Sequence, residues 1–136
     1  MSTNLPIKVK SIDHITIISS DLDATRKFYV DGLGMEEVAR PDFNFPGLWF
    51  QAGPTQIHVT LESPEAGKAG WGDQGVQITS RGHHFAFEVD DAIVATETAR
   101  SLGFKIAHEP KNRPDGAIQV YFFDPDGHVV ELFSGP

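Results

Sequence analysis

Short apolar runs rich in β-branched residues alternate along this chain with two stretches of helical periodicity. Residues 11–18 (SIDHITII) have the composition and alternation of a strand. Ser19 or Ser20 can then cap a helix that has aspartates in its first turn and that ends at Gly32 or Gly34. The opening of the chain therefore predicts a strand followed directly by a helix.

The rest of the chain predicts one more helix and several further strands. The second helix is expected from about Asp90 or Asp91 to Ser101, with Gly103 as its stop. Residues 1–10 read as a loose arm. Strands are expected over residues 35–40, 48–52, 56–61, 83–89, 104–108, 117–123 and 129–133, with a polar loop over 109–116.

The second half of the chain repeats the first. Strands begin at His14 and at His84, and each is followed seven residues later by an aspartate at a helix start. Each helix ends in Leu-Gly and an apolar residue, and each half closes with a strand that carries one central polar residue, His58 or Glu131. This pattern predicts an α+β chain made of two strand-helix-three-strand units.

The module boundaries follow from the same repeat. One domain is expected over residues 1–136, with module 1 at about 11–62 and module 2 at about 83–134. Residues 63–82 are glycine-rich and lack periodicity, so they are expected to form a connector. One unit cannot cover its own sheet, and the two units should therefore pack as one domain or pair across a dimer.

Four side chains of metal-ligand type fall on matching faces of the predicted strands. On the first strand Ile15 and Ile17 lie on the face opposite His14. On the last strand Val130 and Leu132 lie on the face opposite Glu131. If the two sheets form one cleft, their polar faces bring together His14, His58, His84 and Glu131.

Three imidazoles and a carboxylate suit a borderline divalent ion such as Zn, Ni, Fe(II), Mn or Co. Fewer than six protein ligands leave room for water or substrate. Glu131 is then expected to be a ligand and, if substrate displaces it, a general base. Other interpretations stay open. Each histidine can be a hydrogen-bonded core residue, Glu131 can pair with Lys105 or Arg113, and a register change of one residue would exchange His83 for His84.

Composition narrows the classes of function. The net charge of −8 argues against nucleic-acid and anionic-membrane partners. The absence of cysteine excludes disulfides, thiolate metal sites and cysteine nucleophiles. No apolar run has the length of a signal peptide or a membrane span, so a cytoplasmic protein is expected.

Five segments between residues 12 and 134 carry a family resemblance: IDHITI, DLDATRKFYVDGLGM, QIHVTLE, HHFAFEVDD and YFFDPDGHVVELFS. Through them the chain resembles the vicinal oxygen chelate superfamily, which includes glyoxalase I, bleomycin-resistance proteins, fosfomycin-resistance enzymes and extradiol dioxygenases. The resemblance implies two paired βαβββ modules that form a cupped mixed β-sheet with helices on the outer face, and a homodimer. It also implies a metal at His14, His58, His84 and Glu131.

Two positions depart from the pattern of bacterial glyoxalase I. Ile18 stands where that enzyme has an arginine for glutathione, and His58 stands where it has a glutamate. Both departures argue against lactoylglutathione lyase activity.

We therefore expect a metal-dependent, glyoxalase-like lyase, isomerase or dioxygenase, acting on a small molecule chelated to the ion through oxygens. The alternative is a non-catalytic small-molecule binding or resistance protein on the same fold. The expected substrate-binding residues are four aromatic side chains and one arginine: Phe43, Phe45, Trp49, Tyr121 and Arg113.

Overall fold

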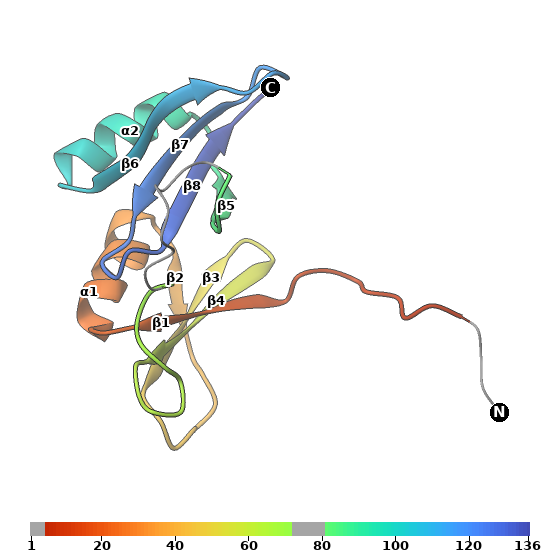
Figure 1. The fold of residues 1–136 in the computed structure, drawn as a ribbon, viewed down its shortest axis with the longest axis vertical. Coiled ribbons are helices and arrows are strands. Elements are labelled where there is room, and N and C mark those ends of the chain that lie inside the picture. Colours follow the sequence, from red (N-terminus) through yellow and green to blue (C-terminus); the bar gives the residue numbers. More distant parts are fainter. Residues whose placement is uncertain (1–4, 72–80) are drawn as a thin grey trace.

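The protein has two halves with the same order of elements (Figure 1). A computed structural model describes residues 5–71 and 81–136. The first half contains β1 (His14–Ser19), α1 (Leu22–Arg26), the π-helical segment η1 (Lys27–Gly32), β2 (Glu36–Val38), β3 (Gly47–Ala52) and β4 (Thr55–Leu61). The second half contains β5 (Phe85–Glu88), α2 (Ala92–Ser101), β6 (Lys105–Asn112), β7 (Ile118–Phe123) and β8 (Val129–Ser134). The predicted α+β class, built from two βαβββ units, is confirmed.

Each half builds one four-stranded mixed sheet. The strand orders are β1-β4-β3-β2 and β5-β8-β7-β6, so β1 and β5 are both edge strands. Each of them runs parallel to the last strand of its own half, and the remaining neighbours are antiparallel. Figure 1 shows the two sheets apart from each other, with α1 and η1 close to the turn between β7 and β8. The predicted mixed β-sheet is therefore present as two four-stranded sheets.

The apolar face of each sheet forms the core. Ile17 and Val59 of the first sheet are buried, as are Val130 and Leu132 of the second. The register across β1 and β4 pairs Ile17 with Val59, so both residues share one face. The polar residues between these positions face the other side of each sheet, as the alternation predicts.

Aspartates start both helices. Asp21 caps α1 and Asp91 caps α2, and each carboxylate accepts hydrogen bonds from two backbone N–H groups of the first turn. The structure matches the prediction at Asp91, but the predicted cap at Ser19 or Ser20 is wrong. Ser19 belongs to the sheet instead, because β1 continues to it and pairs it with Leu61. Within the two described ranges, no helix is long and apolar enough to cross a lipid bilayer.

Several strand boundaries differ from the prediction, and those of β6 and β5 are two of them. β6 continues to Asn112, through part of the segment that was expected to be a loop. This edge strand accommodates Pro110 because its register against β7 is irregular there. β5 is shorter than the predicted strand over 83–89 and begins directly after His84.

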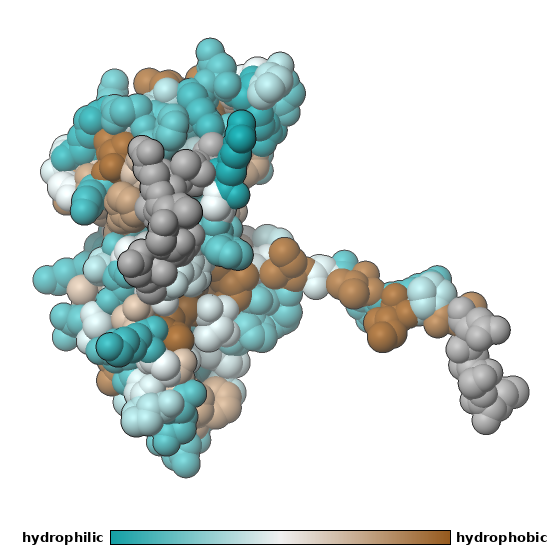
Figure 2. Space-filling view, viewed as in Figure 1, coloured by the Kyte–Doolittle hydropathy of each residue, from teal (hydrophilic) through white to brown (hydrophobic). Residues whose placement is uncertain are grey.

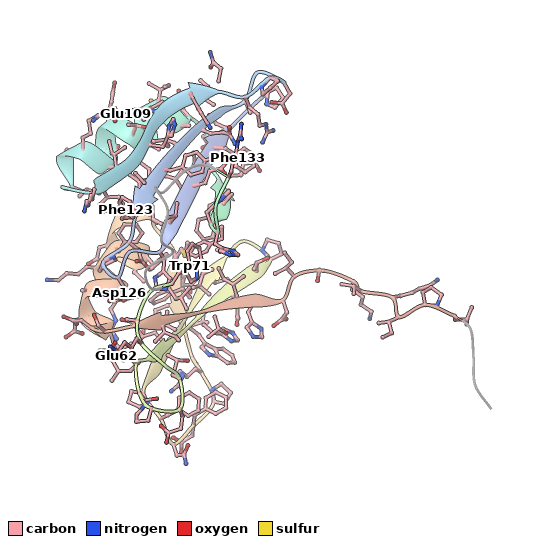
Figure 3. The ribbon with its side chains drawn as sticks, viewed as in Figure 1. Glu62, Trp71, Glu109, Phe123, Asp126 and Phe133 are labelled. Atoms are coloured by element: carbon pink, nitrogen blue, oxygen red, sulfur yellow. The ribbon has the colours of Figure 1, made fainter. Side chains whose placement is uncertain are left out.

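The described part of the connector lies against the first strand. Gly70 N donates a hydrogen bond to Ile18 O (3.2 Å). Trp71 follows at the meeting of the two halves, with its ring edge-on to Phe85 and to His128 (Figure 3). Residues 72–80 of the predicted connector lie outside the described residues.

A buried polar network joins the two halves. Asp124 Oδ2 accepts hydrogen bonds from the Tyr29 hydroxyl (2.7 Å) and from His128 Nδ1 (2.7 Å). Asp124 Oδ1 accepts from the backbone N–H groups of Asp126 and His128, both at 2.9 Å. The side chains of Tyr29, Asp124 and His128 are at most 5% exposed. This shared carboxylate ties η1 of the first half to the β7–β8 turn of the second.

Tyr29 should make the free energy of unfolding depend on pH in the alkaline range. Burial, and then the charge and hydrogen bond of Asp124, raises the pKa of Tyr29 well above its ordinary value of 10.0. A raised folded-state pKa means that this contribution to stability is complete below about pH 10 and is lost as the pH rises toward the folded-state pKa. We expect Tyr29→Phe to lower the free energy of unfolding by about 1 kcal/mol at neutral pH and to flatten the decline above about pH 10. Urea unfolding across this pH range measures both effects, and a decline as steep as that of the wild type would contradict the assignment.

Candidate metal centre

The four predicted ligands lie in two pairs, one in each half. The rings of His14 and His58 are stacked with their centroids 3.9 Å apart. His84 Nε2 lies 3.0 Å from Glu131 Oε1. Over residues 5–71 and 81–136, no group of three or more histidine, aspartate or glutamate side chains is placed to hold one ion. A single chain in this conformation therefore presents two half-sites, the His14–His58 pair and the His84–Glu131 pair.

Strand register explains the His14–His58 pair. His58 on β4 lies opposite Thr16 of β1, which is two residues from His14 on the same face of that strand. On the other side of β4, Trp49 of β3 lies opposite His58, and the two rings stack at 3.9 Å with an angle of 1°. The His58 ring is thus held between two other rings, which restricts its rotation.

A relay of hydrogen bonds determines which nitrogen of neutral His58 carries the proton. Gln51 Nε2 donates to Gly53 O (2.7 Å), and Gln51 Oε1 accepts from Gln56 Nε2 (2.9 Å). Gln56 therefore presents its Oε1 to His58 Nε2, which lies 2.9 Å away. Because Gln56 Oε1 can only accept a hydrogen bond, His58 Nε2 is the donor and His58 Nδ1 keeps its lone pair.

The surroundings of both imidazoles favour metal ligation. Burial lowers the pKa of His58, and the neighbouring His14 lowers it further, so His58 stays neutral as a ligand must. His14 Nδ1 lies 2.8 Å from Asp13 Oδ2. A carboxylate at this position orients an imidazole and leaves its Nε2 lone pair for a metal.

The His84–Glu131 pair brings two acceptor atoms together. His84 Nδ1 lies 2.8 Å from Gly82 O, and a carbonyl oxygen only accepts, so Nδ1 carries a proton. A neutral His84 then has a lone pair at Nε2, and this lone pair faces the Glu131 carboxylate at 3.0 Å. The two atoms repel unless a proton or a metal cation lies between them. The pair is therefore suited to share a cation.

Neighbouring side chains hold Glu131 in position. Glu131 lies in the middle of β8 and is 4% exposed. Its Oε2 accepts a hydrogen bond from Gln119 Nε2 (3.0 Å) on the adjacent strand. Tyr121 lies opposite Glu131 across β7 and β8, and its ring packs edge-on to His84 with centroids 5.3 Å apart. These partners offset the cost of burying a carboxylate in an apolar strand.

Three of the five predicted substrate-binding residues lie next to the His14–His58 pair. Phe43 and Phe45 stack with centroids 5.1 Å apart, and Phe43 lies 6.3 Å from Trp49. Trp49 in turn stacks on His58. The Arg40 guanidinium covers the two phenyl rings at 4.9 Å and 5.0 Å. The three aromatic residues form a wall beside the half-site.

The other two predicted substrate-binding residues belong to the second half. Tyr121 is buried beside His84. Arg113 donates to both carboxylate oxygens of Asp115, each at 2.8 Å, and this pairing is the main reason that the pKa of Asp115 falls to about 2. Arg113 is therefore already engaged by a neighbouring anion, which weakens the expectation that it binds a substrate carboxylate.

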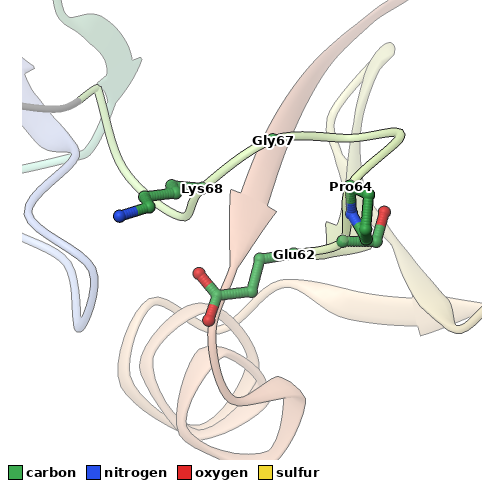
Figure 4. Close-up of a pocket in the computed structure, with 5 residues that line it drawn as sticks. Glu62, Pro64, Gly67 and Lys68 are labelled. Atoms are coloured by element: carbon green, nitrogen blue, oxygen red, sulfur yellow. The ribbon is translucent and has the colours of Figure 1, made fainter.

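A cleft of about 810 Å³ lies on the face of the first sheet that carries His14 and His58, further along β1 and β4 than the two imidazoles. Thr16 and Thr60, the next residues on the histidine-bearing face of β1 and β4, line it together with Ile18 and Phe45. Residues of the segment 62–66 line its far side. Figure 4 shows the adjoining pocket, lined by Glu62, Pro64, Gly67 and Lys68, where the chain at Gly67 crosses β1. A small molecule therefore has room on the same face of the sheet as the two imidazoles.

Sequence reasoning missed the groups that orient the ligands: Asp13, Gln51, Gln56, Gly82 and Gln119. Asp13 directly precedes His14, and this adjacency was a usable signal. Gln119 shares a strand face with Tyr121, which was another. The hydrogen bonds from Gln51 to Gln56 and on to His58 depend on the register between β3 and β4, so no local sequence pattern predicts them.

The chain is similar to known proteins over almost its whole length. The family profile of the Glyoxalase/Bleomycin resistance protein/Dioxygenase superfamily matches residues 11–132. The Arabidopsis thaliana protein named Glyoxylase I 4 is 27% identical over 131 residues, which cover 93% of this chain and 72% of that protein. Lactoylglutathione lyase from Haemophilus influenzae is 27% identical over 127 residues, which cover 89% of this chain and 90% of that protein.

A solved structure agrees with this similarity. The crystal structure of a Bacillus anthracis protein described as a glyoxalase family member has a TM-score of 0.73 to this chain at 25% sequence identity. The match covers 97% of this chain and 100% of that chain. The resemblance seen in the sequence is confirmed, and the chain belongs to the glyoxalase/bleomycin resistance protein/dioxygenase superfamily.

Proposed function

We propose that the protein is a metal-dependent, glyoxalase-like enzyme that binds a small molecule through oxygens at a divalent ion. The proposed ligands are His14, His58, His84 and Glu131. The observation that carries the proposal is the contact between His84 Nε2 and Glu131 Oε1 at 3.0 Å, two atoms that lie this close only when they share a proton or a metal cation. His14 and His58 support it, because each neutral ring keeps one lone pair after its hydrogen bond is made. This donor set fits Zn, Ni, Fe(II), Mn or Co.

We propose further that the complete site forms between two chains of a homodimer. Among the described residues of one chain the ligands come only in pairs, and each pair lies at the edge strand of its sheet and that strand's neighbour. The His14–His58 pair of one chain and the His84–Glu131 pair of another supply four ligands. Two-fold symmetry then creates two equivalent sites.

The chain's own residues have distinct parts in the proposed chemistry. A bound ion supplies Lewis-acid polarisation of the substrate oxygens. Glu131 is the proposed general base where the substrate displaces its Oε1 from the ion, since Gln119 continues to hold Oε2 and Oε1 would then be available to take a proton from the substrate. Phe43, Phe45 and Trp49 exclude water from one side of the site. Proton abstraction beside a polarised oxygen is the chemistry of a lyase or an isomerase.

The cleft on the histidine-bearing face of the first sheet argues against a glutathione substrate. Among the residues that the structure describes, its lining includes Ile18 and the carboxylates Glu62 and Glu65, but no lysine or arginine. A glutathione adduct carries carboxylates, which would meet like charges in this cleft. Although one relative is a lactoylglutathione lyase, we propose a different small-molecule substrate for this chain.

Elemental analysis tests the metal site. Protein purified without a histidine tag and incubated with Ni, Zn, Mn or Fe(II) is expected to retain about one ion per chain. His84→Ala is expected to lose the ion, because Glu131 alone remains in that half-site. His83→Ala is the matched control, since the His83 ring packs near Trp71, with centroids 6.1 Å apart. A metal-free wild type after this treatment would contradict the proposal and favour a non-catalytic binding protein.

A further inference from the structure

The ring of His58 is held on both faces and at one edge. It stacks on His14 with centroids 3.9 Å apart and an angle of 15°, and on Trp49 at 3.9 Å and 1°. Its Nε2 lies 2.9 Å from Gln56 Oε1. A half-turn of the ring about its Cβ–Cγ bond would exchange the places of Nδ1 and Nε2, but it would carry the ring through the space of both neighbours. The orientation of this imidazole is therefore fixed before an ion binds.

Gln56 takes its own orientation from the hairpin of β3 and β4. The register places Gln51 opposite Gln56, and Gly53 lies in the turn that joins the two strands. Gln51 Nε2 donates to Gly53 O, so its Oε1 is left to accept from Gln56 Nε2. If the Gln56 amide were reversed, its Oε1 would face Gln51 Oε1 and two acceptors would meet. Gln56 therefore offers His58 an acceptor.

The stacked rings of His14 and His58 cannot both reach one ion as they lie. An imidazole binds a metal through a lone pair in the plane of the ring, and two planes 15° apart at this separation meet only far from the nitrogens. One ring has to turn. β1 begins where the N-terminal arm leaves the body of the molecule (Figures 1 and 2). The side chains of His14 and of its partner Asp13 are 42% and 88% exposed there, so His14 is free to turn while His58 stays in place.

We propose that Gln56 is a positioning residue that makes His58 the stationary ligand and directs its Nδ1 to the ion. The inference rests on the proposed function, because that function supplies the ion. Gln56 acts through His58 and is not itself a ligand. Asp13 and Gly82 have the opposite effect on the other two histidines, since each engages Nδ1 and leaves Nε2. The site then takes one imidazole through Nδ1 and two through Nε2.

NMR of the metal-free protein with isotope-labelled histidine tests the positioning. The nitrogen chemical shifts of a neutral imidazole show which ring nitrogen carries the hydrogen. We expect the wild type to carry it at Nε2 of His58. Gln56→Leu removes the acceptor from a half-buried position and should give a mixture of both forms. Gln56→Glu keeps an acceptor and should keep the wild-type form.

The matched control is Thr60→Val. This residue lies two positions from His58 on the other side, on the same face of β4, and its change should leave the His58 signals as they are in the wild type. The same Nε2-protonated form in Gln56→Leu as in the wild type would overturn the positioning role. A wild type that carries the hydrogen at Nδ1 of His58 would overturn it as well.

Cadmium with an NMR-active nucleus identifies the ligating atom. Cd²⁺ is a closed-shell ion like Zn²⁺, and we expect its scalar coupling to appear at Nδ1 of His58 and at Nε2 of His14. The dissociation constant for Cd²⁺, measured by competition with a chelator, should rise about 10–100-fold in Gln56→Leu and return toward the wild-type value in Gln56→Glu. Coupling at Nε2 of His58 would overturn the inference and retain the proposed function. A wild type that binds no metal, but whose His58 form depends on Gln56, would support the positioning and contradict only the proposed function.

Discussion

Mixing two chains that each lack one ligand should restore metal binding. His14→Ala keeps the His84–Glu131 pair intact, and His84→Ala keeps the His14–His58 pair intact. Each homodimer then lacks one ligand at every site, and we expect both variants to lose the ion. A mixed dimer contains one site with all four ligands and one site that lacks both His14 and His84. Because random exchange makes about half of the dimers mixed, about a quarter of the wild-type metal content should return, as measured by elemental analysis after gel filtration.

The matched control for this experiment mixes His14→Ala with His58→Ala. Both changes fall in the same half-site, so every site of a mixed dimer still lacks one ligand and no metal should return. Tags of different mass verify that the chains have exchanged. A site completed within one chain would give no recovery in either mixture. That result would retain the four ligands but contradict the shared site.

The architecture could be predicted because its signals are local and occur twice. Asp91 marks a helix start, and Gly34 and Gly103 follow the helix ends with positive φ angles of 75° and 79°. His14 and His84 occupy equivalent positions in the repeat, and the structure places them at the start of β1 and directly before β5. Alternation within each strand then separates the core face from the polar face without any knowledge of tertiary contacts.

The arrangement of the two half-sites could not be predicted in the same way. Alternation relates side chains within one sheet, so it could place His14 near His58 and His84 near Glu131. It carries no information on how two separate sheets, or two chains, lie relative to each other. Ser19 is a second case, because its pairing with Leu61 is a contact between strands that are distant in the sequence. This pairing prevailed over a local sequence that favours a helix cap.

The expectation for Arg113 did not weigh a signal that was present. Arg113 was expected to be a substrate-binding residue, and Asp115, two residues further along the chain, accepts hydrogen bonds from its Nε and Nη2. A short loop with an arginine and an aspartate at this spacing satisfies itself locally. In the second half-site the polar contacts that matter come instead from neighbouring strands, as Gln119 shows.

Asp124→Ala should be the most destabilising of these substitutions. The change removes the acceptor of four hydrogen bonds, and it leaves the Tyr29 hydroxyl, His128 Nδ1 and two backbone N–H groups without that acceptor in a buried site. We expect the free energy of unfolding, measured in urea at neutral pH, to fall by about 3–5 kcal/mol, a large share of the stability of a typical domain. Asp91→Ala is the matched control, because its exposed carboxylate accepts two backbone N–H bonds and its loss should cost only about 1 kcal/mol. Similar losses for the two variants would mean that burial adds nothing to the contribution of the Asp124 network.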